Sequence, residues 1–391
     1  MRIFFFFTLL IFCSSINSAQ SRLIPFRKGN EWGFCNYQKE IKIPVQFQYA
    51  DKFVNGFARV MLNGKYGLLN EKGRLIAKPE YEDIYNVINN RAAIEINSLW
   101  GFIDKSGKQI LKPQYDQVYS FCEGLAAVRK KDKWGFIDTN GTEVIPLIYS
   151  NVFSFKNGLT GVSIGGKFGF INKKGKEIIK IIYSQIPFRY NDIFSDSLSA
   201  VQLNEFWGFI NIKGKLVVPN IFDFASAFSE NLAAIESGKE YGFIDKKGNV
   251  VIQPGYDNVY EFHQNLCCVW KNKLAGYINR KGKMISAIQF SEANSFNEGR
   301  ARVGKGGKFG FIDTTGKVVI PLIYNGEDNF HEDLAAVKKV DKWGFINKIG
   351  KVVIPFKYES ATLFADGIAS VFYNGKWGFV GKNGIEYWDG N

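Results

Sequence analysis

The chain has little histidine, methionine and cysteine, and it has no long apolar run beyond its first residues. Two His, three Met and five Cys stand against 36 Phe, 18 Tyr and 40 Gly in 391 residues. Stretches with helical periodicity are scarce. The few cysteines argue against a disulfide framework of the small-domain kind, and a hydrophobic fraction of 46% argues against disorder. The aromatic and glycine content favours β-structure with many tight turns.

Recognisable catalytic motifs are missing as well. The sequence contains no G-x-S-x-G, P-loop or Rossmann fingerprint, and GGKFG at 165–169 and 306–310 is predicted to be a hairpin turn. His263 and His331 lie 68 residues apart, without a Cys or carboxylate cluster at that spacing, so we expect surface or linker histidines. We therefore predict no cofactor, no metal site and no enzymatic activity. A glycan-active site of two Asp from different repeats is the least favoured alternative.

The N-terminus reads as an export signal. Residues 1–19 place one Arg before an unbroken apolar run and then small polar residues, which is typical of a signal peptide cleaved after Ala19. The apolar run is about half the length that spans a bilayer, and an uncleaved anchor is the alternative. We expect a secreted, periplasmic or cell-surface protein.

Export would place the remaining cysteines in an oxidising compartment. Their repeat positions suit small apolar residues, and a bond between Cys267 and Cys268 would be strained, so the sequence leaves their oxidation state open. The four are Cys35, Cys122, Cys267 and Cys268.

A fixed period runs through the rest of the chain. KWGFIDTNGTEVIP at 133–146 returns as KWGFINKIGKVVIP at 342–355, and the Gly of this phrase recurs every 34 residues. The single exception is the step of 39 from Gly169 to Gly208, which indicates a five-residue insertion within 184–194 that either bends the array or divides it into two halves. We therefore expect residues 20–391 to form one repeat array without a separate domain. The glycines are Gly33, Gly67, Gly101, Gly135, Gly169, Gly208, Gly242, Gly276, Gly310, Gly344 and Gly378.

Most repeats place an aromatic residue before this glycine. Six of the eight Trp occupy that one position, while Ala275 replaces the aromatic in one repeat and Lys39 replaces a second, later Gly in another. Such a distribution predicts a structural role in every repeat. The Trp-Gly pairs are Trp32 and Gly33, Trp100 and Gly101, Trp134 and Gly135, Trp207 and Gly208, Trp343 and Gly344, and Trp377 and Gly378.

Each repeat is predicted to be a three-stranded meander. GLAAVRKK, WGFID and TEVIP within 124–146 are strand-like, and the intervening DK and TNG are turns. Asn63-Gly64 in the first turn favours a tight hairpin with positive φ. In the second turn an Asp or Asn stands three residues before a Gly, as in Asp104 to Gly107, which suits a type I turn. Eleven such meanders are joined by linkers of the Y-D-x-V-x-x-F type.

The middle strand is apolar on both faces and must be covered on both. Trp134 and Phe136 point to one side, and Gly135 and Ile137 to the other. A Gly inside a strand is costly unless something needs the space, so we expect a bulky group of the neighbouring repeat, such as the aromatic at Tyr149 or its equivalents, to lie across it.

These features predict an all-β tandem array of about eleven three-stranded meanders, solenoid-like or superhelical. A closed propeller-like ring is the alternative, disfavoured because eleven blades are many and each would have three strands instead of four.

The recurring Trp-Gly phrase resembles the WG repeat proteins, a mainly bacterial family. The resemblance covers roughly residues 21–391 in eleven copies. It implies a repeated β-structure, often exported or surface-associated, without an agreed activity or any transferable site residue.

The charge is concentrated in the second turns. The net charge is +13, and turns stacked in register would form one basic edge. This edge is either a binding site for an acidic polysaccharide or other polyanion, or a means of keeping strand edges soluble. Its residues are Lys105, Lys108, Lys173, Lys174, Lys176, Lys213, Lys215, Lys246, Lys247, Arg280, Lys281, Lys283, Lys317, Lys348 and Lys351.

We interpret the whole as a non-enzymatic binding or scaffolding protein for a protein partner or an envelope component. Binding of cell-wall or acidic polysaccharide through the basic edge is the alternative. An export signal argues against nucleic acid as the partner. Trp270 and Trp388 lie outside the repeat pattern and are the expected exposed aromatics for sugar stacking.

Overall fold

The structure is a computed structural model that describes residues 23–186 and 194–389. This part of the chain forms 42 β-strands and contains no helix, which confirms the predicted all-β class. None of it therefore qualifies as a membrane-spanning helix. The predicted signal peptide and most of the predicted insertion lie outside the described residues.

The strands fall into two compact units. The described strands of unit 1 are β5 (Phe57–Leu62), β6 (Lys65–Asn70), β7 (Leu75–Tyr81), β8 (Asp83–Ile84), β9 (Arg91–Ile96), β10 (Leu99–Asp104), β11 (Gln109–Tyr115), β12 (Gln117–Val118), β13 (Leu125–Lys130), β14 (Lys133–Asp138), β15 (Glu143–Tyr149), β16 (Asn151–Val152), β17 (Leu159–Ile164), β18 (Lys167–Asn172) and β19 (Glu177–Tyr183).

Unit 2 contains both the first and the last strands of the chain. Its strands are β1 (Ile24–Lys28), β2 (Glu31–Cys35), β3 (Ile41–Phe47), β4 (Tyr49–Ala50), β20 (Leu198–Leu203), β21 (Phe206–Asn211), β22 (Leu216–Phe222), β23 (Phe224–Ala225), β24 (Ala233–Ser237), β25 (Glu240–Ile244), β26 (Val250–Tyr256), β27 (Asn258–Val259), β28 (Leu266–Lys271), β29 (Leu274–Asn279), β30 (Met284–Phe290), β31 (Glu292–Ala293), β32 (Arg300–Lys305), β33 (Lys308–Asp313), β34 (Val318–Tyr324), β35 (Gly326–Glu327), β36 (Leu334–Lys339), β37 (Lys342–Asn347), β38 (Val352–Tyr358), β39 (Ser360–Ala361), β40 (Ile368–Tyr373), β41 (Lys376–Gly381) and β42 (Trp388–Asp389).

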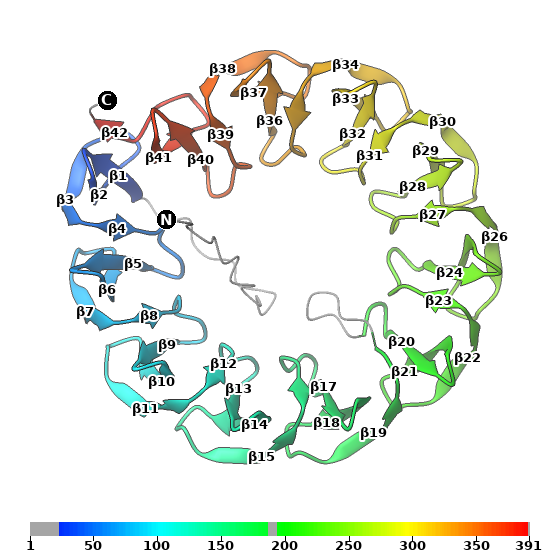
Figure 1. The fold of residues 1–391 in the computed structure, drawn as a ribbon, viewed down its shortest axis with the longest axis horizontal. Coiled ribbons are helices and arrows are strands. Elements are labelled where there is room, and N and C mark those ends of the chain that lie inside the picture. Colours follow the sequence, from blue (N-terminus) through cyan, green and yellow to red (C-terminus); the bar gives the residue numbers. More distant parts are fainter. Residues whose placement is uncertain (1–22, 187–193, 390–391) are drawn as a thin grey trace. The chain divides into compact units, whose positions relative to one another are not determined.

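The repeating element is a four-stranded antiparallel blade. Nine of the eleven sheets in the described residues have four strands, such as β12-β13-β14-β15 (Figure 1). The second, third and fourth strands of this blade are the three strands of the predicted meander. The first strand, β12, is the part that we did not predict. It arises from the linker, where Gln117 pairs with Arg129 and Val118 with Val128 of β13.

A tight turn folds the linker back onto the meander. We call it the inner turn, and in the example blade its tip is Glu123 and Gly124, at φ 50° and 89°. Cys122 and Leu125 form an antiparallel bridge that closes the turn. Two consecutive left-handed residues make the tight hairpin type that matches strand twist. A linker that turns back in this way adds the short first strand to the three strands of the predicted meander.

The chain's last strand joins its first blade. In the sheet β3-β2-β1-β42, the parallel strand β42 occupies the position of the short first strand (Figure 1). Arg27 is paired with Trp388, and the Lys39 Nζ donates a hydrogen bond of 3.1 Å to the Trp388 carbonyl. The predicted open solenoid of three-stranded meanders is therefore wrong. Four-stranded blades whose chain ends meet in one sheet form a β-propeller, the alternative that the strand count had disfavoured.

The third strand of each blade is buried on both faces. In β14, Trp134 and Phe136 pack with Phe155 of the following blade, while Ile137 packs with Phe102 of the preceding one. The aromatic residue after the repeat glycine, a Phe or Tyr277, meets a Phe of the next blade at ring centroid distances of 4.8 to 5.2 Å in most blades. Trp100, Trp134 and Trp207 are buried, Trp32 and Trp343 are half-buried, and Trp377 is 38% exposed.

The glycine of the Trp-Gly pair accommodates the backbone of its own blade. A Cβ added at Gly135 would lie 2.5 Å from the Ile145 carbonyl oxygen and 2.8 Å from the Leu147 nitrogen. The fourth strand bulges at this point, between the pairs Trp134 with Tyr149 and Phe136 with Ile145. The expected contact with an aromatic ring of the neighbouring repeat is therefore wrong at Gly135, whereas at Gly378 the ring of Trp388 does lie over the glycine. Tyr149 pairs beside Trp134 within the blade, and the bulge brings the strand backbone over the glycine.

The two departures from the repeat keep its geometry. Lys39 adopts φ 64° where other repeats use Gly. Ala275 is fully buried and pairs with Phe290, as Trp134 pairs with Tyr149.

The Gly135→Ala substitution tests the close approach. The added methyl must displace the backbone of β15, so we expect a loss of about 3 kcal/mol or more in the free energy of unfolding, measured by urea denaturation. Gly255→Ala is the control, because a Cβ there lies 3.9 Å from its nearest neighbour, the Gln253 carbonyl oxygen. A Gly135→Ala protein as stable as the Gly255→Ala protein would contradict the close approach.

Candidate binding face

The predicted basic residues lie in the turn between the third and fourth strands, which we call the lysine turn. Asn279 shows how the turn is built, because its Oδ1 accepts hydrogen bonds of 3.0 Å from the backbone N–H groups of both Lys281 and Lys283. Gly282 takes φ 77°. The predicted side-chain cap and left-handed Gly are therefore confirmed at this turn.

The basic residues divide into two sets by their position in the turn. The first set follows the capping Asp or Asn directly. It comprises Lys105, Lys173, Lys246, Arg280 and Lys348. The second set is exposed, and in the part of the chain that the structure describes none of its members makes an ion pair. It comprises Lys108, Lys174, Lys176, Lys213, Lys215, Lys247, Lys281, Lys283, Lys317 and Lys351.

Lysine turns and inner turns lie at the same end of each blade. Consecutive loops of an antiparallel sheet alternate between its two ends, so the first and third loops share one end. Direct contacts agree with this, since the Lys105 N–H donates to the Asn90 carbonyl at 3.1 Å and the Arg300 Nε donates to the Lys348 carbonyl at 3.1 Å. We call this end of the blades the turn face.

Acidic and amide side chains of the inner turns join successive blades. Glu123 accepts hydrogen bonds from the backbone N–H groups of Asn157 and Gly158, at 2.7 and 3.0 Å, in the next inner turn. The same bond recurs at Asp196, Glu230, Gln264, Glu298 and Glu332. We did not predict these contacts. Their signal in the sequence is an acidic or amide residue that recurs at the left-handed tip of each inner turn.

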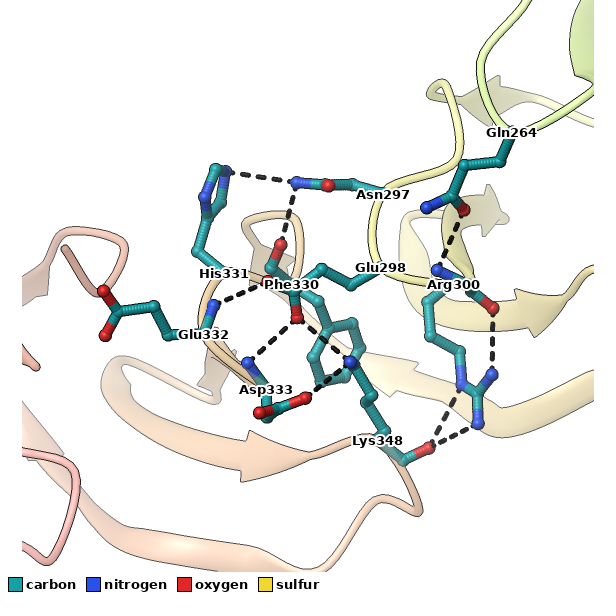
Figure 2. A network of polar contacts seen from close by, with 10 residues as sticks. Gln264, Asn297, Glu298, Arg300, Phe330, His331, Glu332, Asp333 and Lys348 are labelled. Atoms are coloured by element: carbon teal, nitrogen blue, oxygen red, sulfur yellow. Dashed lines mark hydrogen bonds and ion pairs between the residues drawn. The ribbon is translucent and has the colours of Figure 1, made fainter. Parts of the chain in front are cut away.

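Figure 2 shows the most extensive of these contacts, centred on Glu298. Its carboxylate accepts hydrogen bonds from the backbone N–H groups of Glu332 and Asp333, at 2.7 and 2.9 Å, and lies 3.1 Å from the Lys348 Nζ. Although burial raises the pKa of Glu298, the hydrogen bond from Asp333 and the Lys348 ammonium lower it overall. The Asn297 Nδ2 donates to the Phe330 carbonyl at 2.9 Å, beside the ring of His331.

The same ion pairing neutralises part of the predicted basic edge. Lys173 pairs with Glu123 at 3.1 Å, Lys246 with Asp196 at 3.7 Å, and Lys348 with Glu298. Because these three lysines hold neighbouring blades together, the charge available to a ligand lies in the second set and in Lys105, which is exposed and makes no ion pair in the described residues.

His263 and His331 lie in inner turns of two different blades of unit 2. Within residues 23–186 and 194–389, no three His, Cys, Asp or Glu side chains are grouped so that they would hold a metal ion.

Cys267 and Cys268 are free thiols in the structure, and both are buried. They point to opposite faces of β28, so each belongs to a different core cluster. Burial raises the pKa of the Cys268 thiol to about 12.

The expected exposed aromatics do not form a stacking surface. Trp388 is 8% exposed and forms part of β42, so the expectation that it is free for a sugar is wrong. Trp270 is half-buried against the core cluster that contains Tyr277.

One buried ion pair departs from the repeat. Arg302 of β32 and Glu327 of β35 pair between adjacent blades, and only 3% of the Glu327 side chain is exposed. Burial raises the pKa of Glu327 to about 7, although the Arg302 guanidinium opposes this shift. The equivalent residues of the neighbouring blades, Ala293 and Ala361, are small and apolar. The interface between these two blades therefore contains an ion pair where the neighbouring blades have an apolar residue.

The chain matches one family model repeatedly. The WG containing repeat matches residues 32–66, 66–100, 100–134, 134–168, 168–205, 207–240, 241–274, 276–309, 309–343 and 343–377. No curated protein matches the chain.

Among solved structures, one similar chain is a eukaryotic initiation factor, at 10% identity and a TM-score of 0.43, covering 85% of this chain and 95% of that one. The extracellular domain of a putative hybrid two component system from B. thetaiotaomicron is 9% identical with a TM-score of 0.26, covering 86% and 63%. PorZ, a surface component of the type-IX secretion system of Porphyromonas gingivalis, is 10% identical with a TM-score of 0.26, covering 92% and 65%.

Glu298→Gln tests the contact between inner turns. The neutral side chain accepts weaker hydrogen bonds and loses the ion pair, so we expect stability in urea to fall by about 1–2 kcal/mol at neutral pH. Because the folded state lowers the pKa of Glu298, its contribution is present above the unfolded pKa and is lost as the pH falls through the folded pKa. The difference between the two proteins should therefore shrink on acidification.

Glu71→Gln is the matched control, because Glu71 is an exposed residue of a lysine turn. We expect this change to leave the stability nearly unaltered. Equal losses in both variants, or a difference that does not depend on pH, would contradict the role of Glu298.

Proposed function

Because the chain belongs to the family of proteins built from the WG containing repeat, we propose that it is a non-enzymatic binding protein whose turn face holds an extended anionic polymer. The observation that carries this proposal is the second set of turn lysines, which are exposed and make no ion pair in the described residues. Lysine ammonium groups that recur on successive blades suit a polymer whose negative charges also recur along its length. A polyanion bound in this way releases counterions, so its affinity falls steeply with salt.

An acidic polysaccharide of the cell envelope fits this chemistry best. The net charge of +13 favours association with an acidic surface. The leader-like residues 1–19 place the protein outside the cytoplasm in this proposal, where nucleic acid is not the expected partner. The absence of catalytic motifs from the sequence supports a binding role over a catalytic one.

A protein partner is the second candidate. Ile212 and Ile349 lie in lysine turns and are 41% and 77% exposed. Apolar residues beside mixed charges are typical of the core and rim of a protein interface. Binding of this kind would resist salt.

Co-sedimentation with dextran-sulfate beads tests the polyanion proposal. Wild-type protein should bind at low ionic strength and be released by high salt. The double variant Lys281→Gln, Lys283→Gln should bind about tenfold more weakly, taking somewhat under 1 kcal/mol for each lysine at a polyanionic surface. The slope of log affinity against log salt should become shallower.

The double variant Lys305→Gln, Lys308→Gln is the control. It removes the same charge from the turn between the second and third strands of the following blade, at the end opposite to its lysine turn. Neutral dextran beads are the control for binding by stacking of aromatic side chains on sugar rings, because they carry no charge. Equal weakening in both variants would show that only net charge matters, and the absence of binding at low salt would exclude a polyanion ligand of this kind.

A further inference from the structure

The fourth strand is the outer edge of ten of the eleven blades in the described residues, and it is usually protected against pairing. Figure 1 shows β26, β30, β34 and β38 along the outer edge of unit 2. A free strand edge pairs with other strands unless Pro or charged side chains prevent it. Eight of the ten Pro in the chain lie in fourth strands. They are Pro44, Pro79, Pro113, Pro146, Pro219, Pro254, Pro321 and Pro355.

Two fourth strands lack proline, and they differ in charge. β19, with the sequence EIIKIIY, carries Lys180 at its centre and Glu177 at its start. β30, with the sequence MISAIQF, carries no charged residue at all. Among the ten seven-residue fourth strands, β30 is the one with neither form of protection. Its central residue is Ala287, at the position that Pro146 and Pro321 occupy in other blades.

The edge of β30 carries no second strand in the described residues, although Gly316 of the next blade's lysine turn lies close to the Ile285 carbonyl at its start. Within the described residues this strand pairs with β29 alone. Ser286 and Phe290 point into the core, at 5% and 3% exposure, and Met284 is 39% exposed. Its backbone can accept a further strand, and none of its side chains carries a charge that such a strand would have to bury.

We propose that β30 pairs with β30 of a second copy of this chain. A two-fold antiparallel pairing centred on Ala287 joins two four-stranded blades into one continuous sheet. The inference is independent of the polyanion proposal, because it concerns a different edge of the blade.

The distribution of proline and charged residues over the fourth strands favours a second copy of this chain as the partner of β30. Pairing of β30 with itself brings no like charges into opposition, whereas the same pairing of β19 would place Lys180 opposite Lys180. Proline blocks the remaining fourth strands. Because β30 is the one unprotected edge among the ten seven-residue fourth strands of the described residues, association through these edges stops at two copies instead of growing into a fibre. A seven-residue edge is a small interface, so the dimer should form and dissociate readily.

Sedimentation equilibrium of the full protein over a range of concentrations tests the proposal. Wild-type protein should show a concentration-dependent monomer–dimer equilibrium. Ala287→Pro restores the residue that other fourth strands tolerate at this position, and it should weaken dimerisation at least tenfold. Ala287→Lys imitates the centre of β19 and should act in the same direction. Unchanged circular dichroism spectra and melting temperatures would show that both variants fold.

Pro321→Ala supplies the converse test. β34 has no charged residue, so removing its proline leaves a second open edge. This variant should form species larger than a dimer. A wild-type protein that stays monomeric at high micromolar concentration, or a dimer that persists in both folded Ala287 variants, would overturn the proposal.

Discussion

The burial of the third strand on both faces is the constraint on which the rest of the structure depends. Trp134 and Phe136 need the following blade, and Ile137 needs the preceding one. A blade with one neighbour would leave a row of large apolar side chains in water, at a cost of roughly 1.5–3 kcal/mol for each fully exposed side chain. A terminal blade with no neighbour on one side would therefore lower the free energy of unfolding of the whole array. The pairing of β42 with β1 gives the first blade its missing short strand and provides the neighbour that a free end would lack.

The same constraint leaves the turns free to vary. Once the strands supply the packing, polar contacts join the turns of the turn face, in the left-handed inner turns and in the caps of the lysine turns. Glu298 and Lys348 belong to this polar network, whereas Lys281 and Lys283 extend beyond it. The lysines that we propose as the binding residues therefore stand beside residues of the same type that hold the blades together, and position within the turn distinguishes the two sets.

The sequence predicted local structure well and assembly poorly. Local sequence determines the strands around Trp134 and the tight turns, and the 34-residue period is visible in the sequence itself. These features could therefore be inferred directly. The additional short strand of each blade could not be inferred in this way. It forms only because the linker folds back onto the meander, where Gln117 and Val118 pair with β13. The role of Gly135 was misassigned for a related reason. A bulge is a property of two paired strands, and the sequence of one strand does not reveal which backbone will lie over the glycine.

The meeting of the chain ends is the claim that most needs a direct test. Lys28 and Asp389 are paired residues of adjacent strands, at a separation that suits a disulfide. In the double variant Lys28→Cys, Asp389→Cys, mild oxidation should produce an intramolecular disulfide, identified by mass spectrometry of the unreduced digest. Lys28→Cys with Lys281→Cys, on a different blade, should not form one. A folded protein in which positions 28 and 389 never link would contradict the pairing of the last strand with the first blade.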